Sequence, residues 1–340
     1  MDLKTAELFY EKGHVFIEQG DYGKAIEAFS QAISLEPDNE RCANYFHGRS
    51  FAYSAAGAYG KALADANKAL DLDPIALHFE IRGDVYKNMG EYDKALSNYT
   101  EALKVDANQA RISYKRGLLY CQRKKCKKAL KDFDNAVSLE PECRQYLKQR
   151  ALMYQYLNKY NLAIADYTTA ISVCSRTGDW SDLADFSRNR GIAYFHLKQY
   201  DKAIDDYKIV TLLNPDDPEI CNPAIAAYSK IIEIQPDKAA FYYERGMMYN
   251  RLMQYDKAIA DYTEAIRLAP DDAGFFYDRG LTYSAQNAYG QAAADFTAAI
   301  RLSTGDALTF KWHGEVYLTN DDEFINICTD CLEDVRQKND

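Results

Sequence analysis

No stretch of this 340-residue sequence approaches the roughly 18 consecutive apolar residues that a helix needs to cross a bilayer. The opening MDLKTAELFYEKG also lacks the apolar core of a secretory signal. Basic charge is in deficit, with 41 Lys and Arg against 51 Asp and Glu and a net charge of -10. Because proteins that grip phosphate backbones generally present a basic surface, this balance disfavours nucleic acid as a partner. We therefore predict a soluble protein of the cytoplasm, without membrane insertion.

The eight cysteines form no disulfide framework. Their scatter over a long chain predicts reduced thiols rather than the cross-links of a small secreted domain. Cys328 and Cys331 make the sole C-x-x-C pair, but no second pair accompanies it, and the nearest histidine is His313. We expect buried thiols there, and we predict no metal ion and no other cofactor.

Signatures of catalysis are missing as well. The sequence contains no H-E-x-x-H, no G-x-S-x-G and no G-x-G-x-x-G. Its five histidines, at positions 14, 47, 78, 196 and 313, are dispersed, so that no acid–base pair is indicated. The chain is accordingly predicted to have no catalytic residues and not to be an enzyme.

What the chain does contain is one short motif many times over. YKRGLLY at 114–120, YERGMMY at 243–249 and YDRGLTY at 277–283 each place an arginine before a small residue and a tyrosine four residues after the arginine. The aligned small residues are Gly13, Ser50, Gly83, Gly117, Ala151, Gly191, Gly246, Gly280 and Gly314. Four of the eight gaps between these positions are 34 residues long. The motif therefore belongs to a repeated structural unit.

Each unit is predicted to be a helical hairpin. Apolar residues and alanines spaced three or four apart indicate two amphipathic helices, here named helix A and helix B. The polar QYDKA at 254–258 is typical of the tight turn between them, and Pro270 ends helix B because proline cannot continue a helix. The framework is complete in the seventh copy, at Tyr242, Gly246, Tyr249, Tyr255, Ala258, Tyr262, Ala265 and Pro270.

This spacing and pattern resemble the tetratricopeptide repeat (TPR) along nearly the whole chain. Eight copies begin near residues 6, 43, 76, 110, 144, 184, 239 and 273, and a degenerate ninth copy follows, rich in acidic residues. The resemblance implies an all-α fold, a right-handed superhelical solenoid of antiparallel helix-turn-helix repeats with a C-terminal capping helix. Such a cap argues against fusion to a catalytic domain.

The repeats also indicate what the arginine does. Sixteen residues after it, helix B carries an aspartate in six copies, and where Lys12 replaces the arginine the equivalent position holds Ala28. We predict a partly desolvated Arg–Asp pair within each hairpin or with the neighbouring repeat, which makes the motif scaffold. The pairs are Arg49 and Asp65, Arg116 and Asp132, Arg150 and Asp166, Arg190 and Asp206, Arg245 and Asp261, and Arg279 and Asp295, with Arg82 opposite Asn98.

The repeat series breaks between Pro215 and Pro236, where only a helix B pattern fits. The predicted organisation is repeats 1–6 over residues 1–215, an irregular half-repeat or hinge over 216–238, and repeats 7–8 with the degenerate capping repeat over 239–340. The lone helix either kinks the stack or takes the vacant slot and continues it.

A second irregularity is the insertion CSRTGDWSDLADF at 174–186. Its Trp180 either contacts a partner or folds back on the adjacent helices. Both interpretations remain open at this stage.

In TPR proteins the A helices line a concave groove that generally holds an extended peptide. The resemblance therefore implies contact residues at helix A positions two, five, six, nine and twelve. The selected residues are Arg111, Tyr114, Lys115, Leu118, Lys148, Leu152, Arg188, Ile192, Phe195, Tyr243, Met247, Tyr277 and Leu281. A basic middle and an aromatic C-terminal part predict a protein or peptide partner with an acidic segment. The alternative is that several of these side chains pack between adjacent helices.

Residues 111–131 hold nine basic side chains and no acidic one. In a chain of negative net charge this stretch is either a solvated turn or an attractor for an acidic peptide, a phosphopeptide or an anionic surface. We predict a protein-interaction scaffold or adaptor.

The alternative function is a co-chaperone-like or regulatory subunit that contacts a chaperone tail or a catalytic partner. Co-chaperone members of the family hold a Glu-Glu-Val-Asp tail in a dicarboxylate clamp, and Arg111 and Lys115 match its last pair. His47, Phe51 and Ile81 occupy the earlier positions and cannot make the same bonds, which disfavours tail binding.

Overall fold

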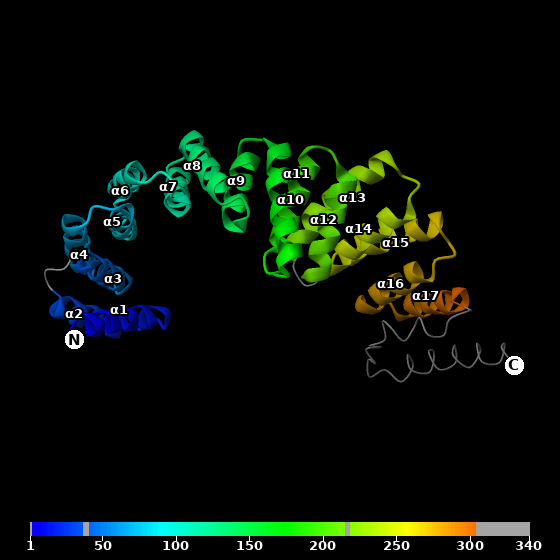
Figure 1. Cartoon of the computed structure of the whole chain (residues 1–340). Helices are drawn as coiled ribbons and strands as arrows, with labels where there is room; N and C mark the ends of the chain where they lie inside the picture. The colour runs from blue at the N-terminus through cyan, green and yellow to red at the C-terminus, as the bar shows by residue number, and fades with distance from the viewer. Residues whose placement is uncertain (1, 37–40, 215–217, 304–340) are drawn as a thin grey trace. The chain divides into compact units, whose positions relative to one another are not determined.

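The computed structural model of the protein describes residues 2–36, 41–214 and 218–303, and these residues form seventeen α-helices and no strand (Figure 1). The helices are α1 (Asp2–Glu18), α2 (Tyr22–Leu35), α3 (Cys42–Ala55), α4 (Tyr59–Leu72), α5 (Ala76–Asn88), α6 (Tyr92–Val105), α7 (Ala110–Gln122), α8 (Cys126–Leu139), α9 (Arg144–Tyr156), α10 (Tyr160–Thr177), α11 (Leu183–His196), α12 (Tyr200–Leu213), α13 (Pro218–Ile234), α14 (Ala239–Arg251), α15 (Tyr255–Leu268), α16 (Ala273–Ala285) and α17 (Tyr289–Leu302). The predicted all-α helical repeat solenoid is confirmed. The ninth repeat and the predicted capping helix lie outside the described residues.

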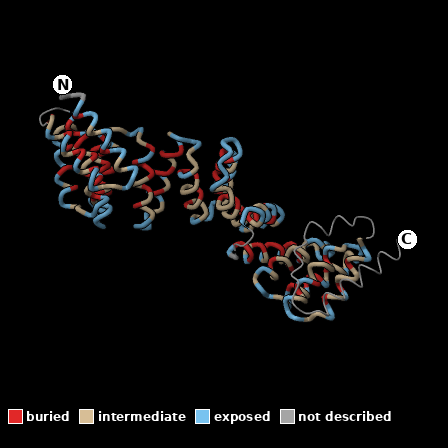
Figure 2. Tube along the Cα trace, turned by 90° about the horizontal axis from the view of Figure 1, so that it is seen from below, coloured by how far each residue is buried: buried red, intermediate tan, exposed pale blue. Residues whose placement is uncertain are grey.

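The chain divides into two compact units, Met1–Asn158 and Lys159–Asp340. The first unit contains α1–α9 and the second α10–α17, and within each unit helices A and B alternate except at α13. Buried residues lie where neighbouring helices of a unit face one another, and exposed residues lie on the outside (Figure 2). This division differs from the predicted organisation by repeats, whose boundaries at 215/216 and 238/239 stay a prediction.

The turn between helix A and helix B contains a residue in the left-handed region. In the first three hairpins it is a glycine, Gly20, Gly57 or Gly90, with φ of 75°, 76° and 79°. Glycine has no Cβ to clash there, so it ends helix A at little cost. Lys124 and Met253 take the same conformation in later turns, with φ of 55° and 57°.

The small residue of the motif allows helix B to approach helix A closely. A Cβ built on Gly117 would lie 2.7 Å from the ring of Phe133, sixteen residues on, and one on Gly246 would lie 2.7 Å from the ring of Tyr262. Such distances are well inside van der Waals contact, so glycine at these two positions leaves the facing rings undisplaced. The copy with Ser50 has Ala66 at the ring position, which leaves room for the hydroxymethyl group.

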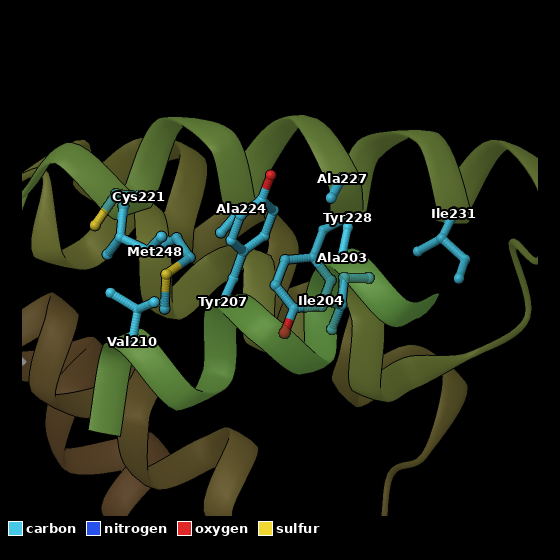
Figure 3. Packing of buried hydrophobic residues seen from close by; sticks show 11 residues of the cluster. Ala203, Ile204, Tyr207, Val210, Cys221, Ala224, Ala227, Tyr228, Ile231 and Met248 are labelled. Atoms are coloured by element: carbon cyan, nitrogen blue, oxygen red, sulfur yellow. The ribbon is translucent and has the colours of Figure 1, made fainter. Parts of the chain in front are cut away.

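The lone helix α13 packs between α12 and α14. Its buried face carries Ile220, Ala224, Tyr228 and Ile231, which join Tyr207, Val210 and Met248 in one apolar cluster (Figure 3). Most of this cluster comes from residues that are buried almost completely. The sequence lacks a helix A at this point. The single helix α13 fills the gap, because its apolar residues pack against both α12 and α14 in one core.

Candidate functional site

The recurrent arginine forms a two-pronged ion pair with the aspartate sixteen residues later. Nε and Nη2 of the arginine donate to the two carboxylate oxygens at 2.7–2.9 Å, and each aspartate is buried. The geometry is the parallel fork that makes Arg–carboxylate pairs strong. The predicted pairs are confirmed at Arg49 and Asp65, Arg116 and Asp132, Arg190 and Asp206, Arg245 and Asp261, and Arg279 and Asp295.

The remaining donor of these arginines ties neighbouring repeats together. Nη1 donates to a hydroxyl on the preceding helix at 2.9–3.1 Å, in the pairs Arg49–Ser30, Arg116–Thr100, Arg190–Thr168, Arg245–Ser229 and Arg279–Thr263. Arg82 bonds Asn98 and Asn67 in the same way, at 2.7 and 2.9 Å. Arg150 donates to Asp134 at 3.3 Å, and its pairing with Asp166, in the other unit, stays a prediction.

The tyrosine of the motif lies beside the guanidinium. In the pairs Arg49–Tyr53, Arg116–Tyr120, Arg150–Tyr154, Arg190–Tyr194 and Arg279–Tyr283, Cζ lies 5.8–6.0 Å from the ring centroid. A cation over an aromatic ring at this distance is attracted by the ring quadrupole. Arginine, small residue and tyrosine therefore form one packing device, repeated along the chain.

Two predicted site residues, Arg111 and Lys115, are already paired inside the first unit. Arg111 Nη2 and Lys115 Nζ each donate to the carboxylate of Glu80 at 2.7 Å, and Lys115 also donates to Asp84. The Glu80 side chain is only 3% exposed, and Asp84 accepts a further bond from Tyr99 Oη at 2.6 Å. The two cations of α7 are thus balanced by two carboxylates of α5. Sequence reasoning missed this, although the acidic residues at positions five and nine of the preceding helix A are the signal.

Two imidazoles lie close to these charges. The rings of His47 and His78 are 5.5 Å apart, and His78 Nδ1 donates to the Asp73 carbonyl oxygen at 2.7 Å. Nδ1 of His47 and Nε2 of His78 are buried without a hydrogen-bond partner. Burial, reinforced by His78 and by the nearby cations Arg111 and Lys115, lowers the pKa of His47 to about 3. His47 is therefore neutral at physiological pH.

The cations that remain available lie at the α7–α8 turn. Five exposed lysines lie in this turn and in the first six residues of α8, and within the described residues no ion pair involves them: Lys124, Lys125, Lys127, Lys128 and Lys131. Arg123, the sixth basic residue of the turn, pairs with the exposed Asp93 at 3.0 Å. We call these five lysines the turn lysines. They are the strongest uncompensated positive charge of the stretch 111–131.

Position nine of the A helices holds an apolar side chain in six of the eight repeats, while α1 has His14 there and α5 has Asp84. The six are Phe51, Leu118 and Leu152 in the first unit and Ile192, Met247 and Leu281 in the second. Phe51 and Leu281 are each 42% exposed, and the other four are half-buried. The residues on either side, at positions eight and ten, are buried in all six repeats. We call these six residues the position-nine row.

The predicted tyrosines contribute mainly to packing. Tyr114 is buried, with its ring centroid 4.9 Å from that of Tyr146. Tyr243 lies 4.7 Å from the Phe275 ring and donates from its hydroxyl to Asp278. For Tyr114, the structure favours packing between helices over contact with a partner.

The other predicted residues lie at the margin between surface and core. Phe195 is half-buried 5.4 Å from the Tyr200 ring, and Tyr277 is half-buried 5.7 Å from the Phe296 ring. Lys148 and Arg188 are half-buried too, and Trp180 of the insertion is 50% exposed. Contact of these residues with a partner stays a prediction.

Among residues 2–36, 41–214 and 218–303, no helix combines the length and apolarity needed to span a bilayer. Nor does any group of three or more His, Cys, Asp or Glu side chains there have an arrangement that could hold a metal ion. Cys328 and Cys331 lie outside these ranges.

Sequence models of the tetratricopeptide repeat match residues 6–39, 184–217 and 239–272, and a TPR repeat model matches 83–122. A search of curated proteins finds no match. PilF of Pseudomonas aeruginosa has a similar structure at 16% identity and a TM-score of 0.53, covering 70% of this chain and 99% of that one.

The C-terminal part of a TPR repeat-containing protein from Cytophaga hutchinsonii is similar at 15% identity and a TM-score of 0.53, covering 77% of this chain and 95% of that one. A tetratricopeptide repeat protein from Parabacteroides merdae is 21% identical, with a TM-score of 0.47 and coverage of 85% and 99%. At these identities the solved structures bear on the fold alone. The sequence matches and the fold agree: the chain is a tetratricopeptide repeat protein, a kind of scaffold for protein–protein interaction.

Proposed function

We propose that the chain is an adaptor that binds an extended segment of a partner protein along the A helices of a unit, through the members of the position-nine row in that unit. The observation that carries this proposal is the contrast between position nine and its neighbours. Six repeats place an apolar side chain at position nine and leave it partly in water, while positions eight and ten are buried. Burying such side chains against a partner would release free energy in proportion to the apolar area covered.

The proposed partner segment is acidic, and the turn lysines are the residues that attract it. Their charge is exposed and uncompensated, which raises the rate of encounter with an anionic segment. Arg111 and Lys115 contribute less than the sequence suggests, because Glu80 and Asp84 already accept their hydrogen bonds. The same contacts lend no support to a chaperone-tail clamp, since a tail carboxylate would have to displace Glu80.

Affinity capture from native lysate with two variants of the full chain tests the proposal. Phe51→Ser and Leu281→Ser each remove one exposed member of the row, in different units, and we expect each to reduce the amount of captured partner. The matched control is Leu212→Ser, because Leu212 is 82% exposed on helix B and outside the row. Equal capture by wild type and all three variants would refute binding along the row.

A further inference from the structure

In the seven described repeats that follow another helix, position ten of helix A is always buried, and position three is buried in six of them, with Phe241 partly buried in the remaining one. The position-ten residues are Ala52, Val85, Leu119, Met153, Ala193, Met248 and Thr282, and all are buried. The buried position-three residues are Tyr45, His78, Ile112, Tyr146, Phe186 and Phe275. Ile112 and Leu119, for example, pack against Leu96 and Tyr99 of the preceding α6. These two positions are therefore the contact face between successive repeats.

The first helix presents this face uncovered by any described residue. Leu8 at position three is 48% exposed, and Val15 at position ten is 47% exposed. Glu11 and Lys12 lie between them on the exposed surface of α1, and neither takes part in an ion pair within the described residues. Lys12 Nζ lies 5.3 Å from the Phe9 ring centroid, in place of the Arg–Asp pair of other repeats. The face is thus a repeat interface with a different, exposed pair of charges at its centre.

We propose that this face of α1 pairs with the same face of a second copy of the chain, the two helices running antiparallel about a two-fold axis. The register that brings Leu8 against the partner subunit's Val15 also brings Glu11 against the partner subunit's Lys12. By symmetry each contact occurs twice, as in any isologous interface. The proposal does not depend on the position-nine row.

Self-complementarity is what favours a second copy over another protein. In a single register each apolar residue of the face meets an apolar residue and each charge meets its opposite. A second copy of the chain therefore supplies a matching surface. Antiparallel helices also place opposite ends of their dipoles together. The interface continues the contact that already joins each helix A to the preceding helix in the stack.

The expected dimer is weak. A standard stable interface buries about 800 Å² on each partner, and one helix face covers less than that. We therefore expect the weight-average mass of the full chain to rise with concentration in the micromolar range. Added salt should weaken the association, since it screens the attraction between Glu11 of each chain and Lys12 of the other.

A charge-swap experiment read by sedimentation equilibrium tests the register directly. Glu11→Lys alone and Lys12→Glu alone each place like charges opposite one another twice, so each variant should stay monomeric. An equimolar mixture of the two should regain association, because the heterodimer pairs lysines of one chain with glutamates of the other. The double variant E11K/K12E should associate as the wild type does. Glu27→Lys, an exposed change on α2, is the control and should associate normally.

Leu8→Asp with Val15→Asp tests the apolar part and should abolish association while helix content by circular dichroism is retained. A wild-type chain that stays monomeric at all concentrations would overturn the proposal. So would monomeric single variants whose mixture fails to associate, since that result would point to a helix of another protein or of an extended chain. If the chain associates but none of the changes on α1 weakens the association, the interface lies elsewhere, and this result would also overturn the proposal.

Discussion

Arg245 donates from Nε and Nη2 to the two carboxylate oxygens of Asp261, at 2.8 and 2.7 Å, and from Nη1 to Ser229 at 3.0 Å. Ser229 belongs to α13, and Thr263 of α15 holds the same place relative to Arg279. The lone helix therefore offers the next repeat the same hydroxyl contact that a regular helix B provides.

Removal of one member of this pair should be costly. Asp261→Ala leaves the Arg245 guanidinium unpaired with its side chain only 18% exposed, and we expect the free energy of unfolding of the chain to fall by about 2–3 kcal/mol. Urea denaturation measures the change. Glu233→Ala, which breaks the exposed pair with Lys230, is the control and should cost much less, because solvent screens an exposed pair. Equal losses for both variants would mean that burial does not set the strength of the pair.

The close approach of helix B should make the motif glycine intolerant of a methyl group. Gly117→Ala puts a Cβ 2.7 Å from the Phe133 ring, and we expect a net loss of about 1–2 kcal/mol despite the better helix propensity of alanine. In the Phe133→Ala background the same change should be neutral or favourable, as a double-mutant cycle would show. Gly60→Ala on α4 has open space around it and should stabilise the chain slightly. A Gly117→Ala chain as stable as wild type would contradict the packing argument.

His47 should make the protein less stable in acid. Its pKa is lowered to about 3 in the folded chain, against an ordinary value of 6.5. Between these values the unfolded chain takes up a proton that the folded chain does not, so the free energy of unfolding falls as pH falls. One proton corresponds to about 1.4 kcal/mol per pH unit.

The measurement is urea denaturation over a series of pH values with His47→Gln as the comparison. The variant should lose less stability than wild type between pH 6.5 and 3. Parallel losses in the two proteins would show that His47 is not the group responsible.

The turn lysines should set the attraction for acidic segments. Lys124→Glu with Lys127→Glu is expected to slow association of a hexaglutamate probe peptide about tenfold at low salt and to flatten its dependence on ionic strength. Lys61→Glu, an exposed change on α4, is the control for net charge. Stopped-flow fluorescence reports the rates.

The complementary variant is Glu80→Gln, which removes the carboxylate charge shared by Arg111 and Lys115. It should strengthen binding of the same probe. The acidic-segment proposal is refuted if the probe binds no better to this variant and the lysine changes do not alter its association rate.

Much of the fold could be predicted because each copy of the repeat places the same residue types at the same spacing. The spacing between Arg116 and Asp132, both in one hairpin, recurs in six copies, so their pairing follows once helix A and helix B are recognised. The glycine opposite an aromatic ring follows from the same spacing. These relations depend on helix periodicity and on one tight turn, both of which are local.

Contacts between hairpins could not be predicted in the same way. Arg111 and Lys115 were selected for a partner, yet they meet Glu80, whose side chain comes from the neighbouring helix A. Tyr114 was selected for the same reason and instead packs on Tyr146 of the following helix A. In both cases the angle at which one hairpin rests on the next decides which side chain turns inward.

The amino-acid sequence by itself determined the repeat, the two helices of each unit and the arginine fork that ties them, because all three depend on residue spacing within a short segment. Only the tertiary structure decided which charges have no ion-pair partner among the described residues, which apolar residues stay partly in water at position nine, and that α1 has a face that none of the described residues covers. Those properties arise where separate hairpins are stacked, and burial and charge compensation there depend on residues about one repeat apart.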